Sequence, residues 1–173
     1  MKGVIAIAVR EMTQTQYGKE AWTAALKKAG IETEPLLLPV SDVSDEAVVS
    51  ILGALSTTLG KSPIEIADVF GEYWVSTFAQ RLYRSHFQGA ATARELLLKM
   101  DNVHVVTTEE MPGARPPRFE YEWKDENTLL MKYRSHRGLI DLMAGLVRGV
   151  GKHYKENLKV RTVSNQTLEI SFC

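Results

Sequence analysis

The segment FEYEWKDENTLLMKY, residues 119–133, predicts a β-hairpin and decides the fold class of this 173-residue chain. Two short runs rich in aromatic and aliphatic residues, Phe119–Trp123 and Leu129–Tyr133, stand on either side of a polar turn at Lys124–Asn127. The chain therefore forms paired strands at this point.

The end of the chain repeats this pattern. Leu158–Val163 and Leu168–Phe172 flank a tight turn at residues 164–166, which predicts a second hairpin. Between the two hairpins, apolar residues at helical spacing predict one helix; they are Leu139, Leu142, Met143, Leu146, Val147 and Val150. The second half should therefore hold a small antiparallel sheet with an inserted helix.

The sequence of the first half of the chain predicts several helices, separated by residues that end a helix, such as glycine. Apolar residues at helical spacing run from Val4 to Met12, and a second helical segment, Lys19–Ala29, stops at Gly30. The stretch Glu34–Val40 carries two prolines around three leucines, and it predicts a buried connection.

Three further helices are predicted from their first residues. Each begins at a serine or threonine that can cap it, namely Ser44, Ser62 and Thr92. The first ends at Gly60, the second runs to about Arg84 and the third passes through Met100. Two of them have a glutamate three residues after the cap, Glu65 and Glu95, which predicts a capping box.

Helices first and a small sheet later indicate an α+β fold, with a helical N-terminal half packed on the antiparallel sheet. The length suits one domain, and neither an internal repeat nor a low-complexity linker interrupts the sequence. We therefore expect residues 1–173 to form a single domain.

The chain has 21 Lys and Arg and 21 Asp and Glu, so its formal net charge is zero. A protein without excess positive charge is not attracted to nucleic acid or to an anionic membrane. The apolar start, Val4–Val9, is interrupted by Arg10 and falls short of the roughly 20 residues that cross a bilayer. We expect a cytoplasmic protein with no nucleic-acid partner and no membrane insertion. Cys173 is the single cysteine, so this chain cannot form an intrachain disulfide or a cysteine metal cluster.

The sequence contains no nucleophile elbow, glycine-rich phosphate loop, HExxH motif or paired-carboxylate signature. This argues against assigning the chain to one of the common enzyme classes. Four histidines are present, and only His104 lies in a continuous apolar stretch, Val103–Val106. It is the best candidate for a buried imidazole that ligates a metal or a cofactor. A hydrogen-bonded core histidine is the alternative.

A second candidate group follows the first predicted hairpin. On a strand, side chains two residues apart share a face, so Tyr133, Ser135 and Arg137 would point the same way and bind an anion. Arginine suits a carboxylate because its planar fork donates two parallel hydrogen bonds. In the alternative, Ser135 caps the following helix and Arg137 is solvated.

The third feature is the proline-rich loop Met111–Pro117, which joins His104 to the first hairpin. Its prolines fix backbone angles and could hold a rigid surface against a ligand. An ordinary connecting turn is the alternative.

These motifs occur in the order and spacing of one known family: Asp101-Asn102-Val103-His104, Pro112 to Pro117, and Tyr133-x-Ser135-x-Arg137. They resemble the H-NOX family, the haem nitric oxide/oxygen-binding domains related to the sensor domain of soluble guanylate cyclase. The resemblance covers nearly the whole chain, starting at Met1-Lys2-Gly3 and including Gly71–Trp74. It implies that haem b lies between the helical half and the sheet.

The resemblance also implies roles for single residues. His104 is the proximal ligand of the haem iron, Tyr133, Ser135 and Arg137 clamp the haem propionates, and Pro117 presses on the porphyrin. One cofactor then accounts for three otherwise unrelated features of the sequence.

On the opposite haem face the resemblance implies an apolar wall made of Ile5, Val9, Trp74, Phe78, Leu142 and Leu146; Met100 is expected to contact the haem as well. Oxygen-binding members carry a distal tyrosine, and the matching position here is Leu142. Without a hydrogen-bond donor, the charge on bound dioxygen is not stabilised, whereas nitric oxide needs no donor. Binding of nitric oxide and carbon monoxide with exclusion of oxygen is therefore implied. Trp74 would weaken this conclusion if its indole N–H pointed inward; plain core packing is its other role.

The implied function is that of a gas sensor without catalytic activity of its own. Nitric oxide weakens the bond between iron and His104, and the change is passed to a partner, a histidine kinase or a cyclic-dinucleotide signalling enzyme. The alternatives are an oxygen-binding haem protein, a haem peroxidase or oxygenase, which would need distal acid–base groups, and a haem-free interaction module.

Overall fold

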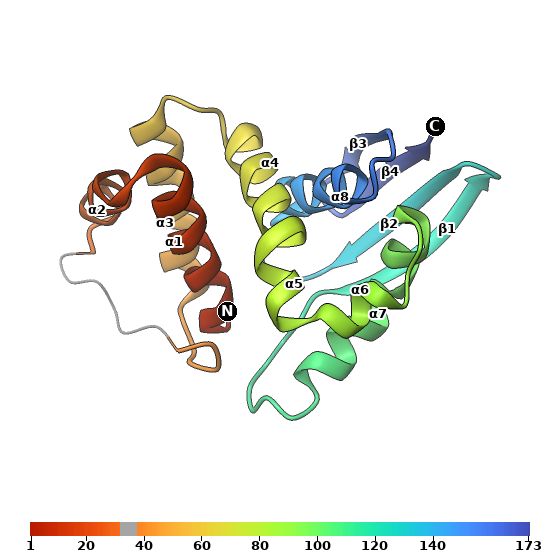
Figure 1. Cartoon of the computed structure of the whole chain (residues 1–173), viewed down its shortest axis with the longest axis horizontal. Coiled ribbons are helices and arrows are strands. Elements are labelled where there is room, and N and C mark those ends of the chain that lie inside the picture. Colours follow the sequence, from red (N-terminus) through yellow and green to blue (C-terminus); the bar gives the residue numbers. More distant parts are fainter. Residues whose placement is uncertain (32–37) are drawn as a thin grey trace.

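The computed structural model describes residues 1–31 and 38–173 and contains both helices and a four-stranded sheet, as predicted (Figure 1). The elements in chain order are α1 (Gly3–Tyr17), α2 (Lys19–Lys28), α3 (Asp45–Leu59), α4 (Pro63–Tyr73), the π-helix η1 (Trp74–Phe78), α5 (Ala79–Leu82), α6 (Arg84–Gln88), α7 (Ala93–Thr108), β1 (Arg118–Asp125), β2 (Thr128–Arg134), α8 (Ile140–Tyr154), β3 (Leu158–Ser164) and β4 (Thr167–Phe172). The α+β class is confirmed.

The helices form two groups on either side of α4. Figure 1 shows α1, α2 and α3 together on one side, and α7, α8 and the sheet on the other. Each side has its own apolar core. The N-terminal core includes Met12, Trp22, Leu55 and Phe70, all almost fully buried.

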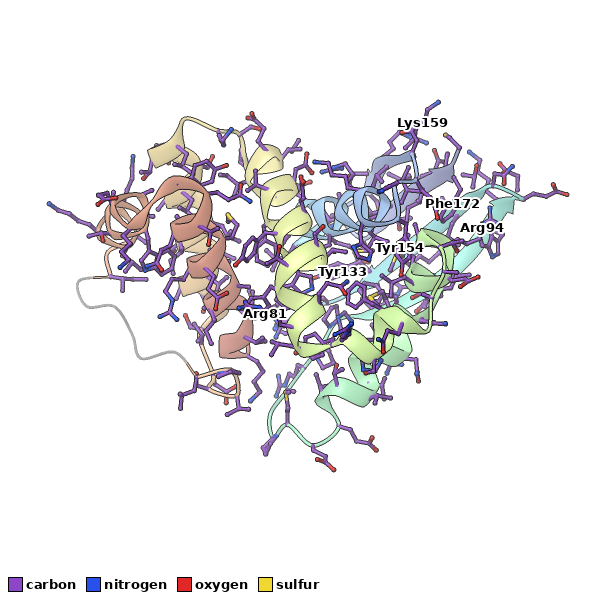
Figure 2. The ribbon with its side chains drawn as sticks, viewed as in Figure 1. Arg81, Arg94, Tyr133, Tyr154, Lys159 and Phe172 are labelled. Atoms are coloured by element: carbon purple, nitrogen blue, oxygen red, sulfur yellow. The ribbon has the colours of Figure 1, made fainter. Side chains whose placement is uncertain are left out.

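The sheet is antiparallel throughout, with the strand order β1-β2-β4-β3. Both predicted hairpins are confirmed, and the first pairs Phe119 with Tyr133 and Trp123 with Leu129. Alternate residues of the central strands, among them Leu129 and Ile170, are buried and form the second core with α7 and α8. At the far end of the sheet, the Arg94 guanidinium of α7 lies 4.8 Å from the ring centre of Phe172 (Figure 2).

The predicted helix starts are confirmed at Ser44, Ser62 and Thr92. The Ser44 hydroxyl accepts a hydrogen bond from the Ala47 N–H at 3.0 Å, and both halves of the Ser62–Glu65 capping box are present. The box predicted at Thr92 is half formed. The Glu95 carboxylate accepts a hydrogen bond from the N–H of Ala91, at 2.8 Å, in place of that of Thr92.

Two helices differ from the prediction. The helix that follows Ser62 is not regular to Arg84, because the chain forms the π-helix η1 at Trp74–Phe78 and then continues as the short helices α5 and α6. Helix α7 runs past Met100 to Thr108, so His104 lies within a helix. Of the segment Glu34–Val40, residues 34–37 lie outside the described residues, and Leu38 and Val40 are exposed, so they do not form a buried connection.

The closest helix pair joins the two sides of the molecule. A Cβ atom added to Gly71 of α4 would lie 2.1 Å from the carbonyl oxygen of Gly145 in α8, and one added to Gly145 would lie 2.1 Å from the carbonyl oxygen of Ala67. Glycine at these positions therefore lets the two backbones touch. An ion pair between Arg148 and Asp68, at 2.6 Å, flanks the contact.

Within the described residues, no single helix has the length and apolarity to cross a membrane; α3 together with Pro63–Leu82 meets both criteria only as a pair bent by 109°.

Candidate functional site

A cavity of about 250 Å³ lies between the N-terminal helices and the sheet side of the molecule. Its lining comes from α1, α4 to α8, β1, β2 and the loop before β1. Nine residues that the sequence singled out line it: Ile5, Trp74, Met100, His104, Pro117, Tyr133, Arg137, Leu142 and Leu146. Residues up to 141 positions apart in the sequence thus meet at one site.

His104 faces this cavity from α7. Its ring lies 5.2 Å from the ring of Phe119, and its Nδ1 is buried without a hydrogen-bond partner among the described residues. Burial lowers the pKa of the imidazole. The backbone of Pro117 and the charge of Asp101 act to raise this pKa, but the effect of burial is larger. The ring is therefore neutral near pH 7, which is the form that ligates a metal. The position of His104 in the cavity lining, with a buried Nδ1 that has no aligned partner among the described residues, favours a ligand role over that of a core histidine.

Asp101 fixes the helix that carries His104. Its carboxylate accepts two hydrogen bonds from Arg118, at 2.8 and 2.6 Å, and a third from the N–H of Phe119 at 2.8 Å. The bond with Arg118 lowers the pKa of Asp101 to about 2. Asp101 lies one helical turn before His104, so this contact ties the imidazole to the start of β1.

Tyr133 and Arg137 both line the cavity. Tyr133 is buried on β2, whereas Arg137 lies beyond the end of that strand, so the strand alternation expected to continue to residue 137 does not occur. Arg137 Nη1 donates to the carbonyl of Arg115 at 2.6 Å. Ser135 does not line the cavity, and its hydroxyl accepts a hydrogen bond from the Arg137 N–H at 3.3 Å. It does not cap α8 either, because that helix has no side-chain cap.

Asp45, at the start of α3, lies beside the Arg137 guanidinium. Arg137 Nε is 2.9 Å from Asp45 Oδ2, but this buried N–H has no aligned hydrogen-bond acceptor in the described part of the chain. Burial acts to raise the pKa of Asp45, and hydrogen bonds from the N-terminal ammonium and from Arg137 outweigh it and lower the pKa. Arg137 is thus paired with Asp45 and bonded to the Arg115 carbonyl, and since a guanidinium has five N–H groups, donors remain for another anion within the described part of the chain.

The rest of the cavity lining is mostly apolar and includes Ile5, Trp74, Leu142 and Leu146, which the resemblance assigned to the apolar wall. Trp74 lies between Phe70 and Phe78, with ring-centre distances of 5.8 and 5.3 Å. Val9 and Phe78 were expected on this wall, yet the structure does not place them in the lining. Both are buried in the N-terminal core.

Five polar residues of the lining were not assigned to the site by sequence reasoning: Lys2, Tyr83, His86, Thr107 and Thr108. Lys2 donates to the carbonyl of Pro112 at 2.7 Å and pairs with Asp42 at 2.8 Å. Tyr83 and His86 line the cavity from the region of α6, and burial raises the pKa of the Tyr83 phenol. No local pattern marks these residues, because they lie in segments of mixed polar and apolar composition.

The chemistry of these walls fits haem. An imidazole with an unpartnered nitrogen suits the iron, a guanidinium with free donors and a tyrosine suit the carboxylates, and apolar side chains suit the porphyrin faces. His104 would hold the metal, and Tyr133 and Arg137 would hold the acid groups.

Comparison with known proteins also indicates a haem-binding domain. The family model described as Haem-NO-binding matches residues 2–162. The chain is 24% identical over 159 residues to the soluble guanylate cyclase gcy-32 of Caenorhabditis elegans, covering 88% of this chain and 23% of that protein. It thus spans about a quarter of the length of this curated relative.

Solved structures extend the likeness to the whole fold. A mutant of Cs H-NOX superposes with a TM-score of 0.87 at 28% identity, covering 99% of this chain and 96% of the other. An oxygen-binding H-NOX domain related to soluble guanylate cyclases, in its oxygen complex, gives 0.82 at 28% identity, with 99% and 95% covered. The I5F mutant of T. tengcongensis H-NOX gives 0.84 at 28% identity, with 99% and 97% covered. The chain therefore belongs to the Haem-NO-binding, or H-NOX, family of haem-containing gas-sensor domains related to soluble guanylate cyclase.

Proposed function

We propose that this chain binds haem b, senses nitric oxide, also takes carbon monoxide, excludes oxygen, and passes the signal to a separate histidine kinase or cyclic-dinucleotide signalling enzyme. The observation that carries the proposal is the make-up of one cavity. Its lining combines the His104 imidazole, whose buried Nδ1 has no aligned partner among the described residues, with mainly apolar side chains.

Haem would supply the ferrous iron to which a diatomic gas binds. The part of His104 is to provide one neutral imidazole, kept uncharged by burial. Tyr133 and Arg137 provide a phenol and a guanidinium in the cavity lining, where they would bind the haem carboxylates and fix the orientation of the ring.

Exclusion of oxygen follows from the residue at position 142. Leu142 offers no hydrogen bond to a bound ligand, so partial negative charge on dioxygen would remain unstabilised. The presence of Tyr83 in the same lining favours a second candidate, an oxygen-binding protein, because a phenol can donate. A solved relative that is 28% identical binds oxygen, so the family allows both outcomes.

Helix α7 is the part of the chain that would transmit the signal. It carries His104 and is tied to the sheet by Asp101 and by the Tyr121 hydroxyl, which donates to the Leu97 carbonyl at 2.8 Å. Any displacement of His104 therefore reaches β1 directly. A partner responds only if it binds the two arrangements with different affinity.

Optical titration of the reduced protein with nitric oxide, carbon monoxide and oxygen tests the proposal. We expect a Soret band that shifts with the first two gases and not with oxygen. His104→Ala should lose the band and regain it with added imidazole, whereas the matched control His153→Ala should keep it. A shift with oxygen would establish the second candidate, and a colourless wild-type protein purified with adequate iron would refute both.

A further inference from the structure

The π-helix η1 carries Trp74, which lines the cavity, and side chains help to hold this segment in place. π-Helical turns are rare, occur mostly as single turns and are frequent at functional sites. Gln80 supports the turn, since its Nε2 donates to the carbonyl of Val75 at 3.2 Å. The same Nε2 lies 3.5 Å from Nε2 of His153 in α8.

A glutamate on α1 binds the chain at both ends of η1. Glu11 Oε2 accepts a hydrogen bond from the Tyr73 hydroxyl at 3.3 Å and an ion-paired hydrogen bond from Arg81 Nη2. Tyr73 directly precedes η1, and Arg81 lies in α5, which follows it; Figure 2 shows Arg81 on the side of α5 that faces α1. Thr15, one turn further along α1, also bonds to the Tyr73 hydroxyl. One carboxylate oxygen thus joins both ends of η1 to α1.

Ring contacts connect this carboxylate to the cavity. The Arg81 guanidinium lies 5.1 Å from the ring centre of Phe78, a cation–π contact. The Phe78 ring in turn stacks on Trp74, with ring centres 5.3 Å apart. Glu11 neutralises the guanidinium and holds it over the Phe78 ring. The order of contacts from α1 is therefore carboxylate, guanidinium, phenyl ring and the indole that lines the cavity.

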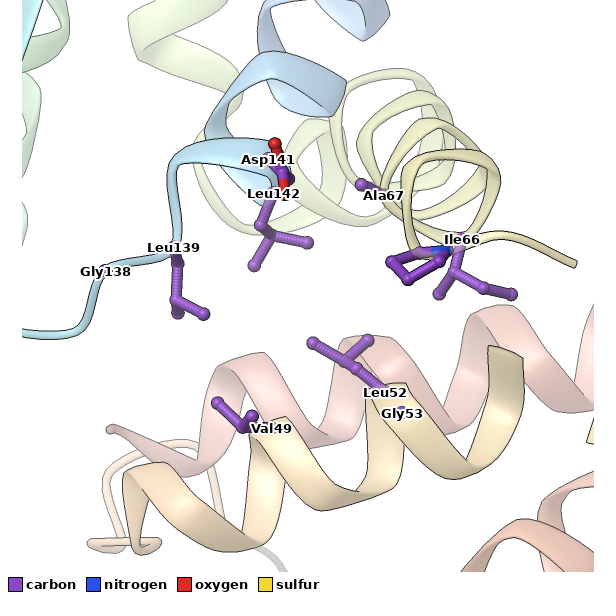
Figure 3. Close-up of a pocket in the computed structure, with 10 residues that line it drawn as sticks. Val49, Leu52, Gly53, Ile66, Ala67, Gly138, Leu139, Asp141 and Leu142 are labelled. Carbon is purple, nitrogen blue, oxygen red and sulfur yellow. The ribbon is translucent and has the colours of Figure 1, made fainter. Parts of the chain in front are cut away.

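The α3 side of the same junction contains a hollow. It has a volume of about 270 Å³ and lies between α3, α4 and the first turn of α8, where Leu52, Ala67 and Leu142 line it (Figure 3). Close packing between α3 and the other two helices is interrupted there. The contacts that α1 makes with α4 and α5 therefore become more important for holding η1.

We propose that Glu11 is a positioning residue for gas discrimination. Its carboxylate holds both ends of η1, so that Trp74 stays in its aromatic stack and does not donate its indole N–H to a bound gas. The inference rests on the proposed function, since it assumes a gas ligand. Exclusion of oxygen requires that no donor reaches the ligand, and Leu142 offers none, whereas a displaced Trp74 would supply one.

Three variants separate this role from a general effect on the fold. Glu11→Ala removes both contacts, and Glu11→Gln keeps an oxygen that can accept from the same two donors. Glu72→Ala is the matched control, because Glu72 directly precedes Tyr73 and pairs with Lys152 of α8. The first measurement is amide hydrogen exchange of residues 74–80 in the protein as purified.

We expect Glu11→Ala to speed this exchange by roughly threefold or more. The effect is limited because the Arg81 side chain is 56% exposed, so solvent screens the ion pair. Glu11→Gln should return most of the difference, and Glu72→Ala should leave the exchange of these residues unchanged.

The second measurement is the C–O stretching frequency of the carbon monoxide complex of the reduced, haem-loaded protein. A donated N–H weakens the C–O bond, so Glu11→Ala should shift the band to lower frequency. In a Trp74→Phe background, which lacks the indole N–H, Glu11→Ala should cause no shift, because residues that act through one another are not additive. A loss of stability alone would not move this band.

Unchanged exchange in Glu11→Ala overturns the proposal. Faster exchange with an unchanged C–O band also overturns it, because Glu11 would then be a structural contact only. A shift that persists in the Trp74→Phe background would mean that Glu11 acts through another residue, which is equally against it. All three results leave the proposed function intact. Should the wild-type protein take up no haem, or should its haem bind no gas, the proposed function fails and the positioning role fails with it.

Discussion

Asp101 is a single residue whose ionisation stabilises the site. Its pKa is lowered to about 2, chiefly by Arg118, so its charge favours the folded state above the ordinary carboxyl pKa near 4. The stabilisation is present at neutral pH and is lost as the pH falls through about 2. Because the Arg118 side chain is 57% exposed, solvent screening limits the contribution to about 1 kcal/mol.

We therefore predict that Asp101→Asn lowers the free energy of unfolding at pH 7 by about 1 kcal/mol, and that the difference from wild type shrinks as the pH approaches 2. Urea unfolding at several pH values measures it. Glu122→Gln, which removes one exposed partner of Lys132, is the control and should change stability by less than about 0.5 kcal/mol. A difference that does not depend on pH would contradict the assignment.

Trp74 tests the discrimination between gases at the same scale. Its ring packs between two phenylalanines, and this packing accounts for its burial without any role for the indole N–H. We predict that Trp74→Phe, which removes the N–H and keeps an aromatic ring, leaves the affinity for nitric oxide and carbon monoxide within about threefold of wild type, a difference of less than 1 kcal/mol. A larger loss for one gas, measured by stopped flow, would mean that Trp74 donates to the ligand.

At the residue scale, the structure places three of the residues singled out from the sequence in the cavity lining, and their roles toward haem stay predictions. His104 is the one histidine in an apolar stretch, and Tyr133 and Arg137 are close in sequence, so all three could be identified without coordinates. Asp45 could not be, because its partner Arg137 is 92 positions away and nothing near residue 45 indicates a contact beyond helix capping.

At the scale of elements, the α4–α8 contact should be the most sensitive to small changes. A Cβ atom at Gly71 would lie 2.1 Å from a backbone oxygen, which cannot move without shifting a whole helix. We predict that Gly71→Ala lowers the free energy of unfolding by roughly 2 kcal/mol or more. Thermal or urea unfolding measures the change.

Gly53→Ala is the matched control for this prediction. Gly53 is also helical, but an added Cβ meets open space, so the substitution should raise stability by up to about 1 kcal/mol through helix propensity alone. Equal effects at the two positions would show that backbone contact between α4 and α8 is unimportant.

The ends of helices could be predicted where a capping residue marks them. They were harder to predict where contacts with distant parts of the chain determine the length of the helix. The caps at Ser44 and Ser62 gave correct helix starts. The sequence did not define the end of α7, because β-branched residues dominate after Asn102 and have low helix propensity. In the structure, hydroxyls of Thr107 and Thr108 bond to carbonyls one turn earlier, each at 2.6 Å, and Asp101 anchors this part of the helix to β1.

At the scale of the whole molecule, α1 to α3 are joined to the sheet side by packing on α4 and by polar contacts around the cavity. Lys2 reaches the loop before β1, and Asp45 reaches Arg137 and His136. These contacts link the two cavity walls, so they influence how firmly the walls are held together.

We predict that Asp45→Ala speeds amide hydrogen exchange in the first turn of α3 and in residues 135–138 by roughly fivefold, about 1 kcal/mol of local opening, with the core strands unaffected. The control is Glu46→Ala, which alters an exposed residue in the same turn. Uniformly faster exchange would indicate general destabilisation, and unchanged exchange would show that the ion pair contributes nothing.

The turn of η1 sets the angular phase of the helical segment that follows it. The N–H of Ala79 bonds to the carbonyl of Trp74, five residues back, so this turn holds one residue more than an α-helical turn. Consecutive residues of an α-helix are about 100° apart, so deleting that extra residue would rotate Ala79 and Tyr83 away from the cavity while Trp74 stayed in place. Helix content would hardly change, yet the pocket would lose part of its lining, which makes the register of this segment as important as its composition.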